Sequence, residues 1–539
     1  EKIAPTGPQL YDILAIQHLY GANTTTALGD TTYRYDPNAL KVETIWDAGG
    51  VDTIDASGFT SGVRINLAPG SFSTISEKYA GGGYTTTLTG KTVYQATDNV
   101  AIAYGVTIEN AVGGRGDDVI TGNDAGNSLL GGEGNDQTSG GAGNDNLNGG
   151  AGDDLLDGGD GFDIAGFYDA AAAVTVDLNA GVAVSASTGR DTLVSIEGAQ
   201  GSDHADTFID GVGSSWLWGA AGDDMFVMTG SGFDVTDCDN VYGGDGRDTV
   251  VFSATRAEST VVLQLGMTEV TTAKGYVIAQ EIETLKFIDG TLTIDLSSHE
   301  AQIARMYETI LDRGHDGGGL RAWTGGLKGG MSLKDIADGF MQSAEFQSKY
   351  GTLDDTGFVK QLYVNMLGRE GEDTGVRAWV GGLKGGMSRA DVVTGFSESN
   401  ENIDRSRAVV EKGLWVTDDH AAQVARLYDT TLDRLPDAVG LEAWIGGLKG
   451  GMTLTQLADG FTGSAEFQSK YGALDYVGFV RQLYRNVLDR EGEESGVQAW
   501  TGGLKGGMSR SEIVVGFSES NEHAVKLAGL IDDGIAVYI

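Results

Sequence analysis

The sequence predicts a multidomain β + α protein: a parallel β-roll with a β-sandwich N-terminal part, followed by all-α helical tandem repeats. Three observations predict this fold class. A nine-residue period that starts with glycine runs without a gap over residues 113–166, and stacked repeats of this length build solenoids of short parallel strands. Strand-like segments precede the period. A longer repeat with apolar residues at helical spacing begins at about residue 298.

Composition narrows the function classes. The 539 residues include 85 glycines and only five prolines, which excludes collagen and proline-rich linkers. A hydrophobic fraction of 40% argues against wholesale disorder. The formal charge of −41, from 36 basic and 77 acidic residues, opposes nucleic acid and anionic membranes as partners and favours cations.

The chain offers neither a disulfide nor a membrane span. Cys238 is the single cysteine, so an exported form of this chain needs another constraint on its fold. No apolar run approaches the roughly 18 residues that a spanning helix requires, which predicts no transmembrane segment. The first residues lack a signal-peptide pattern, so if the protein is exported, its signal is expected elsewhere or the start of the chain has been removed.

The front part opens with a predicted helix. Residues 9–20 place apolar side chains at helical spacing, and strand-like segments follow at residues 44–46 and 64–67.

Six nonapeptides then follow one another: GGRGDDVIT, GNDAGNSLL, GGEGNDQTS, GGAGNDNLN, GGAGDDLLD and GGDGFDIAG. Glycines allow the backbone to turn with φ > 0 and bring carbonyl groups close to an ion, and the acid at position six adds a charged oxygen. Calcium, which takes six to eight oxygen ligands, suits this set. The predicted ligands are Gly114, Gly116, Asp118, Gly132, Gly134, Asp136, Gly141, Gly143, Asp145, Gly150, Gly152, Asp154, Gly159, Gly161 and Asp163.

Position eight is expected to point inward from a three-residue strand, so that only stacked units bury it. Thr138 and Ala165 are poor fillers at this position. The unit at 122–130 has Asn127 and Ala125 where aspartate and glycine are expected, which predicts a weaker or empty site. A flexible glycine-rich linker is the alternative, but a linker explains neither the fixed register nor the periodic aspartate. The pattern resembles the RTX (repeats-in-toxin) nonapeptide, and that resemblance implies a parallel β-roll with calcium between successive turns.

A more degenerate ladder occupies residues 201–251, and ordinary strands at 252–297 are expected to cap it. Cys238 lies beside Asp239 in this ladder, where a buried structural thiol is expected rather than a reactive one. Its predicted metal ligands are Asp206, Gly222, Asp224, Asp239, Gly244, Gly246 and Asp248.

Four separated motifs, LYDILAIQHLYGANTTT, WDAGGVDTIDASGF, INLAPGSFS and GVTIENAVGG, occur in order over about residues 8–166. They resemble the C-terminal β domain of the serralysin family, secreted zinc metalloproteases of Gram-negative bacteria. Carboxylates that cap turns are the alternative to metal binding here. The resemblance implies further calcium ligands at Ala27, Gly29, Thr31, Asp47, Gly49, Gly50, Asp52, Thr107 and Glu109.

The catalytic motif of that family is missing from this chain. Serralysins hold zinc with HExxHxxGxxH, whereas none of the six histidines here lies four residues from another. The chain starts where the catalytic domain of the family would have ended, and we expect no catalytic residues in it.

The back half repeats a helical unit four times. Trp323, Trp379, Trp444 and Trp500 each open the pattern W-x-G-G-L-K-G-G-M-[ST], at spacings of 56, 65 and 56 residues. A two-repeat unit of 56 + 65 = 121 residues has therefore been duplicated. Each glycine turn is followed by a capping box, such as Ser332 with Asp335.

These repeats resemble a helical domain of unknown function that accompanies RTX regions, which implies a fold and no chemistry. The tryptophans could stack on sugars or dock a neighbouring subunit, but a core position is favoured. The acidic loops at 370–373 and 491–494 are expected to be solvated rather than calcium-binding.

The C-terminus, IDDGIAVYI, resembles the uncleaved export signal of type I secretion substrates. The expected domains are residues 1–112 (serralysin-like β domain with a leading helix), 113–166 (first roll), 167–297 (second, degenerate roll and capping strands), 298–417 (first helical pair) and 418–539 (second helical pair with the signal).

Two functions remain open. The favoured one is a secreted, non-catalytic structural subunit of a surface layer, matrix or filament. It would be extracellular in a Gram-negative bacterium, with cell-surface association open, and would fold on calcium after type I secretion. Its expected partners are calcium ions, the secretion machinery, and further copies of itself or cell-surface and matrix components. The alternative is a processed C-terminal portion of a serralysin-like zinc metalloprotease.

Overall fold

The computed structural model describes residues 5–77, 79–80, 93–94, 96–230, 238–264 and 266–537. Residues 231–237 of the predicted degenerate ladder, residue 265 of a capping strand and residues 538–539 of the predicted export signal lie outside these ranges. The chain forms two compact units, Glu1–Val250 with Gly266–Thr268 and Lys274–Ile282, and Val251–Leu265 with Glu269–Ala273 and Glu283–Ile539. The chain passes between the units five times; two of these passages lie within strands, in β24 (Thr249–Phe252) and β26 (Met267–Thr272).

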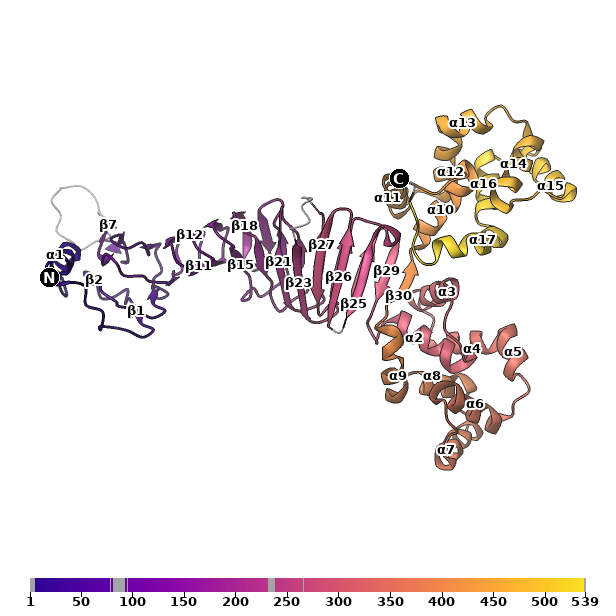
Figure 1. The fold of residues 1–539 in the computed structure, drawn as a ribbon, viewed down its shortest axis with the longest axis horizontal. Coiled ribbons are helices and arrows are strands. Elements are labelled where there is room, and N and C mark those ends of the chain that lie inside the picture. Colours follow the sequence, from indigo (N-terminus) through magenta and orange to yellow (C-terminus); the bar gives the residue numbers. More distant parts are fainter. Residues whose placement is uncertain are drawn as a thin grey trace. The chain divides into compact units, whose positions relative to one another are not determined.

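The first unit is a β-roll in which successive nonapeptides alternate between two sheets (Figure 1). Residues 18 apart are therefore parallel neighbours, as in the pairs Leu129 with Leu147 and Thr138 with Leu156. The strands of the first sheet that belong wholly to this unit run in the order β1 (Thr32–Arg34), β3 (Thr53–Asp55), β9 (Asn110–Val112), β11 (Ser128–Glu133), β13 (Asn146–Ala151), β15 (Ile164–Gly166), β19 (Gly198–Gln200), β21 (Trp216–Ala221), β23 (Cys238–Asp245) and β27 (Gly275–Gln280).

The second sheet contains the alternate turns. Within the first unit its strands are parallel except at β17, which pairs antiparallel with both neighbours. The strands that belong wholly to this unit run in the order β4 (Arg64–Asn66), β10 (Val119–Asn123), β12 (Gln137–Ala142), β14 (Leu155–Asp160), β18 (Gly189–Val194), β17 (Val182–Ser185), β16 (Val174–Asp177), β20 (Thr207–Ile209) and β22 (Met225–Met228). Both sheets continue from the first predicted roll through residues 167–250, the region of the second predicted roll.

The interior of the roll is one side chain deep. Position eight of each repeat is buried, including Thr138, which is 1% exposed, and Ala165. Larger side chains fill the later turns, where Phe208 and Phe226 stack with ring centroids 5.0 Å apart. A core this thin gives each turn little apolar burial, so other interactions must hold successive turns together.

The N-terminal part adds a leading helix and two small sheets to the roll. The predicted helix is α1 (Leu10–Tyr20). One sheet contains β2 (Glu43–Ile45), β8 (Val100–Ile102) and β5 (Phe72–Ser73), and the other β6 (Tyr79–Ala80) and β7 (Val93–Tyr94). The strands of the predicted β-sandwich part do not form a separate sandwich, because β1 and β3 begin the first roll sheet and β4 begins the second.

The second unit contains capping strands and two helical modules. We call residues 298–417 module 1 and residues 418–537 module 2, and each has its own apolar core. The non-helical elements are η1 (Arg256–Glu258), β25 (Thr260–Gln264), β28 (Thr284–Phe287), β29 (Gly290–Thr293) and β30 (Leu414–Thr417). Module 1 contains α2 (His299–Met306), η2 (Tyr307–Leu311), α3 (Gly317–Lys328), α4 (Leu333–Gln342), α5 (Ala344–Tyr350), α6 (Asp355–Leu367), α7 (Asp373–Lys384), α8 (Arg389–Ser397) and α9 (Asn400–Val410).

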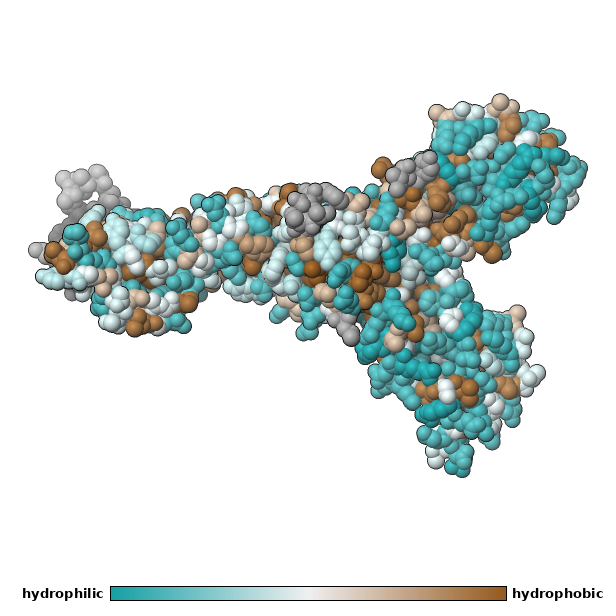
Figure 2. Space-filling view, viewed as in Figure 1, coloured by the Kyte–Doolittle hydropathy of each residue, from teal (hydrophilic) through white to brown (hydrophobic). Residues whose placement is uncertain are grey.

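Module 2 repeats this order of helices. Shifting Arg305 and Glu398 by 121 residues gives Arg426 and Glu519, and both pairs are ion pairs (2.6 Å and 2.5 Å). The face drawn in Figure 2 is mostly hydrophilic over these helices. The helices of module 2 are α10 (Asp419–Leu432), α11 (Ala438–Lys449), α12 (Leu454–Gly463), α13 (Ala465–Tyr471), α14 (Tyr476–Leu488), α15 (Glu494–Lys505), α16 (Arg510–Ser518) and α17 (Asn521–Ile531).

The second unit departs from the sequence prediction at β30, inside the region expected to be wholly helical. Leu414–Thr417 pairs antiparallel with β29, with Trp415 opposite Leu292. The bulky residues of this short segment suit a strand, and β29 offers an edge to pair with. All four predicted capping boxes form, as at Ser332 and Asp335.

Candidate calcium-binding site

The position-six carboxylates line up along the roll, one above the next. In the second sheet, the backbone N–H of Asp118 donates to Oδ1 of Asp136, and the N–H of Asp136 donates to Oδ1 of Asp154 (both 2.7 Å). At the first sheet, the N–H of Asp145 donates to Oδ1 of Asp163 (2.8 Å). Each carboxylate is therefore held by one oxygen against the preceding turn of its own sheet.

The second carboxylate oxygen of these residues has no hydrogen-bond partner. Oδ2 is buried and unpartnered in Asp136, Asp145, Asp154, Asp163 and Asp224 among the described residues, and these residues are at most 3% exposed. A buried carboxylate oxygen without a partner is costly, and native proteins satisfy such atoms. A cation between the turns would supply the missing partner, so these residues fit calcium.

The glycines bring backbone oxygens to the same place. A Cβ atom added at Gly140 would lie 2.1 Å from Oδ2 of Asp145 and 2.7 Å from the carbonyl oxygen of Gly158. A Cβ atom at Gly150 would lie 2.0 Å from the carbonyl oxygen of Gly132. No larger residue fits such approaches. Each gap between turns is lined by carbonyl and carboxylate oxygens, the ligands that calcium takes.

The predicted ligand glycines differ in conformation. Positive φ angles occur at Gly132, Gly134, Gly141, Gly143, Gly150, Gly152, Gly159, Gly161, Gly222, Gly244 and Gly246. The first turn is different, because a Cβ at Gly114 would meet the carbonyl oxygen of Phe59 and one at Gly116 would meet the backbone of Gly62. These two glycines therefore pack on the N-terminal part rather than on an earlier nonapeptide.

Burial changes the acidity of the position-six carboxyls. Desolvation, followed by the neighbouring charges of Asp118 and Asp154, raises the pKa of Asp136 to about 7. Desolvation also raises the pKa of Asp145, Asp154 and Asp224 to about 6. Protons and cations therefore compete for the same buried oxygens, since a metal ligand must be deprotonated.

Asn127, where the sequence predicts a weaker site, is satisfied without an ion. Its side-chain amide donates to the carbonyl oxygen of Glu109 (3.0 Å), and its Oδ1 accepts from the backbone N–H of Asn123 (2.8 Å). Weak occupancy of this gap stays a prediction.

The degenerate ladder keeps the same geometry. Asp224 accepts from the N–H of Asp206 (2.7 Å), and Asp248 from the N–H of Asp224 (2.9 Å). Asp239 instead accepts from the N–H of Ser215, at 2.8 Å. Cys238 is partly buried next to it.

The structure brings together most of the front ligands that the resemblance implies. Asp52 is fully buried, accepts from the N–H of Thr31 (2.8 Å) and donates its own N–H to Glu109 (2.7 Å). Oδ2 of Asp52 has no partner among the described residues. Burial raises the pKa of Asp52, and the charges of nearby acids such as Asp47 and Glu109 raise it further. A Cβ at Gly50 would lie 2.7 Å from the carbonyl oxygen of Gly29.

The remaining front residues lie around this group. Asp47 accepts from the hydroxyl of Tyr33 (2.7 Å) and from the N–H of Gly49 (3.1 Å). Ala27 has a positive φ of 52° and accepts from Ala48 through its carbonyl. Thr107 is exposed, two residues before Glu109.

Two acids that the sequence analysis missed continue the carboxylate lines. The N–H of Asp154 donates to Oδ1 of Asp191 (3.0 Å), and the N–H of Asp163 donates to Oε2 of Glu197 (2.9 Å). They lie 37 and 34 residues further along the chain instead of 18. The available signal was the G-x-D of residues 189–191 followed by Leu193 at position eight, without the leading glycine.

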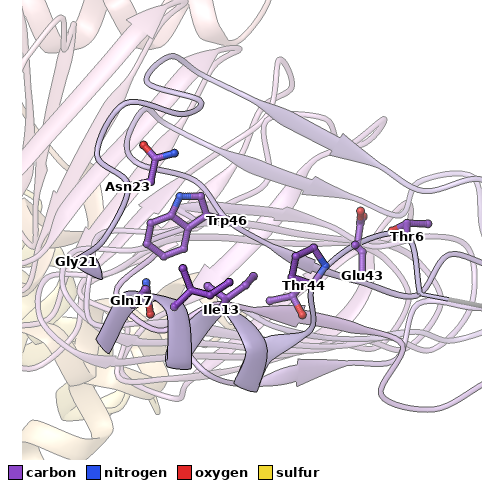
Figure 3. Close-up of a pocket in the computed structure, with 11 residues that line it drawn as sticks. Thr6, Ile13, Gln17, Gly21, Asn23, Glu43, Thr44 and Trp46 are labelled. Carbon is purple, nitrogen blue, oxygen red and sulfur yellow. The ribbon is translucent and has the colours of Figure 1, made fainter. Parts of the chain in front are cut away.

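A separate cavity of about 430 Å³ lies between α1 and β2. Figure 3 shows the indole of Trp46 above Ile13 and Gln17 of the helix. Trp46 Nε1 and Thr44 Oγ1, in its wall, are buried without partners among the described residues. None of the predicted metal ligands lines this cavity.

Comparison with known proteins identifies both repeats. The RTX calcium-binding nonapeptide repeat matches residues 105–138, 131–165, 200–235 and 239–254. A domain of unknown function (DUF4214) matches residues 293–349, 337–406, 416–471 and 458–527. The chain thus contains RTX repeats that bind several calcium ions, and the predicted cofactor and β-roll are confirmed.

The front part is homologous to serralysins. A serralysin of Photorhabdus laumondii subsp. laumondii is 47% identical over 139 residues, 24% of this chain and 25% of the relative. Metallopeptidase AprA of Pseudomonas marginalis is 43% identical over 136 residues, 23% and 25% of the two chains, and serralysin B of Dickeya chrysanthemi is 46% identical over 126 residues, 21% and 22%. The chain spans about a quarter of the length of the curated relatives it matches.

The candidate sites consist of oxygen ligands. Among the described residues, no cluster of three or more His, Cys, Asp or Glu side chains could hold a metal; each gap of the roll instead combines carboxylates with backbone carbonyls. No described helix has both the length and the apolar character needed to cross a bilayer.

Proposed function

We propose that this chain is an exported, non-catalytic structural subunit of an extracellular assembly such as a surface layer, matrix or filament. In this proposal the β-roll is a spacer that calcium stiffens, and the two helical modules dock neighbouring molecules. The duplication of the helical unit supports it most directly. One helical pair would suffice as a passive extension, whereas two pairs offer two docking positions.

The two modules keep their framework while their surfaces differ. The Arg305–Glu398 pair recurs as Arg426–Glu519. At the equivalent surface positions of α9 and α17, 121 residues apart, module 1 has Asp404 and module 2 has Val525, which is 77% exposed. Constant cores with divergent surfaces suit modules that contact different partners.

The difference in calcium concentration between the cytosol and the outside determines where the proposed subunit folds. Extracellular calcium modules bind at about 10⁻⁴–10⁻³ M, far above cytosolic calcium. Inside the cell the stacked carboxylates would repel one another and the roll would remain unfolded, as passage through a type I secretion machinery requires. Outside, binding free energy becomes folding free energy.

The alternative is that the chain is the C-terminal portion of a serralysin-like zinc metalloprotease. The similarity of the front part favours it, since the matched region makes up only about 25% of each relative's length. Determining the reading frame upstream of Glu1 tests it: an in-frame HExxH domain would favour the protease, and its absence the structural subunit.

Electron microscopy of the purified full chain tests the proposal. We expect ordered filaments or sheets at millimolar calcium that disperse in EGTA. Light scattering of the same samples should report a large assembly with calcium and monomers without it. Monomers that stay dispersed at millimolar calcium, although the roll is folded by circular dichroism, would overturn the assembly role.

A further inference from the structure

Residues 166–199 lie between the two blocks that match the nonapeptide repeat, the first of which ends at residue 165 and the second of which begins at residue 200. In the structure, β16, β17 and β18 of this segment are consecutive antiparallel neighbours within the second sheet. β18 pairs parallel with β14, with Leu193 opposite Leu156 and Thr192 opposite Leu155. Leu193 thus occupies position eight of a further, unrecognised repeat.

The turn before β18 has the backbone geometry of a nonapeptide turn. Gly152 N–H donates to the carbonyl of Thr188 (2.9 Å), as Gly134 N–H donates to the carbonyl of Ala151 (2.8 Å). Gly189 has a φ of +90°, and a Cβ there would lie 2.3 Å from the carbonyl oxygen of Gly152. Gly189 therefore stands at position four, and Asp191 at position six.

The gap between this turn and the turn of Asp154 contains unsatisfied oxygens. Asp191 is 1% exposed and accepts from Asp154 through Oδ1. Two further polar atoms, Oδ2 of Asp154 and Oγ1 of Thr188, are buried without partners among the described residues. Their residues are only 3% and 5% exposed, so bulk water does not satisfy them.

The new turn also continues the outer trough of the roll. A trough of about 440 Å³ is lined by positions two and three of stacked turns, at Gly114 with Arg115, Gly132 with Glu133, and Gly150 with Ala151. Ser187 and Thr188 line the same trough. The turn is therefore in register with the three before it.

We infer that residues 187–191 form an additional calcium-binding turn, with Asp191 as its carboxylate ligand, so that the calcium array continues across residues 166–199. This rests on calcium binding by the repeats and not on the assembly role. Sequence patterns miss the turn because Ala186 stands where position one has glycine and because the hairpin of β16 and β17 separates it from the preceding repeat.

The count of bound calcium per chain tests the inference. Asp191→Asn keeps the acceptor oxygen for Asp154 but removes the charge, and we expect it to bind one ion fewer than the wild type by native mass spectrometry and equilibrium dialysis. Asp203→Asn is the matched control, because Asp203 is exposed and outside the predicted ligand set. Its count should equal that of the wild type.

An Asp191→Asn count equal to that of Asp203→Asn would overturn the inference and leave the assembly proposal untouched. If Asp191→Asn does not fold at saturating calcium, Asp191→Glu serves instead, because it keeps the charge on a longer side chain. We then expect a full count with weaker affinity for one ion in a calcium titration, and an unchanged titration would count against the site.

Discussion

At the scale of single residues, the buried carboxyl at position six decides how the roll responds to its solvent. Burial raises the pKa of Asp136 to about 7 and the pKa of Asp154 to about 6. Because the folded pKa lies above the unfolded value, protonation stabilises the calcium-free roll at low pH, and this contribution is lost as the pH rises through about 6–7.

Calcium should therefore stabilise the roll more at pH 7.5 than at pH 5. At the higher pH the calcium-free roll holds repelling carboxylates, whereas at the lower pH protons already neutralise them and compete with the ion. Thermal melting with calcium and with EGTA at both pH values measures the difference. A calcium-induced rise in Tm that is as large at pH 5 as at pH 7.5 would contradict this competition.

Sequence could predict the site wherever the period was intact. Asp136 and Asp154 stand 18 residues apart, so their register alone places them one above the other. Asp191 and Glu197 could not be found in this way, because a hairpin changes the chain length between turns while the sheet restores the spatial order. Their carboxylates become equivalent to Asp154 and Asp163 only in the folded roll.

At the scale of elements, the fourfold tryptophan pattern is a helix-packing device. A Cβ at Gly395 of α8 would lie 2.7 Å from Cη2 of Trp379 of α7, and the same contact recurs between Trp500 and Gly516. Trp379 also packs on Phe396, with ring centroids 5.1 Å apart. Because glycine has no side chain, the tryptophan ring of one helix packs directly against the backbone of the next helix. This contact agrees with the core position favoured for the tryptophans.

Gly395→Ala should lower the free energy of unfolding of module 1 by about 1–3 kcal/mol, because a rigid ring leaves no room for the added methyl group. Gly381→Ala is the matched control in α7, where an added Cβ meets no atom within 4 Å. The control should be neutral or stabilising by up to about 1 kcal/mol, since alanine favours helix. Circular dichroism melts in calcium measure both, and equal effects of the two variants would refute the contact.

Capping boxes and repeat spacing predicted the helices, because these signals are local. β30 was not predicted, since Leu414–Thr417 becomes a strand only when β29 supplies its partner edge. The contact that holds the C-terminal segment could not be predicted from the sequence either. The N–H of Ile535 donates to Asp289 (2.6 Å), 246 residues away, so part of the predicted export signal is buried in the folded protein.

At the scale of the whole molecule, the two units are held by different forces. Each turn of the roll places one side chain, that of position eight, in the interior between the sheets, and buried carboxylate oxygens without partners lie between turns. Each helical module instead has an apolar core of its own and ion pairs such as Arg305 with Glu398. Calcium binding is therefore expected to supply most of the stability of the first unit, and burial of apolar side chains most of the stability of the second.

Removing calcium should unfold the roll and leave the helical modules folded. In EGTA we expect backbone amides of residues 113–251 to exchange with deuterium as in an unfolded chain, because stacked carboxylates then face one another without a cation. Amides in helices such as α6 and α14 should keep their protection. Magnesium in place of calcium is the control and should not restore the roll, since it demands a tighter octahedral shell. Exchange across 113–251 that is unchanged by EGTA would show that the turns hold together without metal, and loss of protection in both units at once would show that the helical modules depend on the roll.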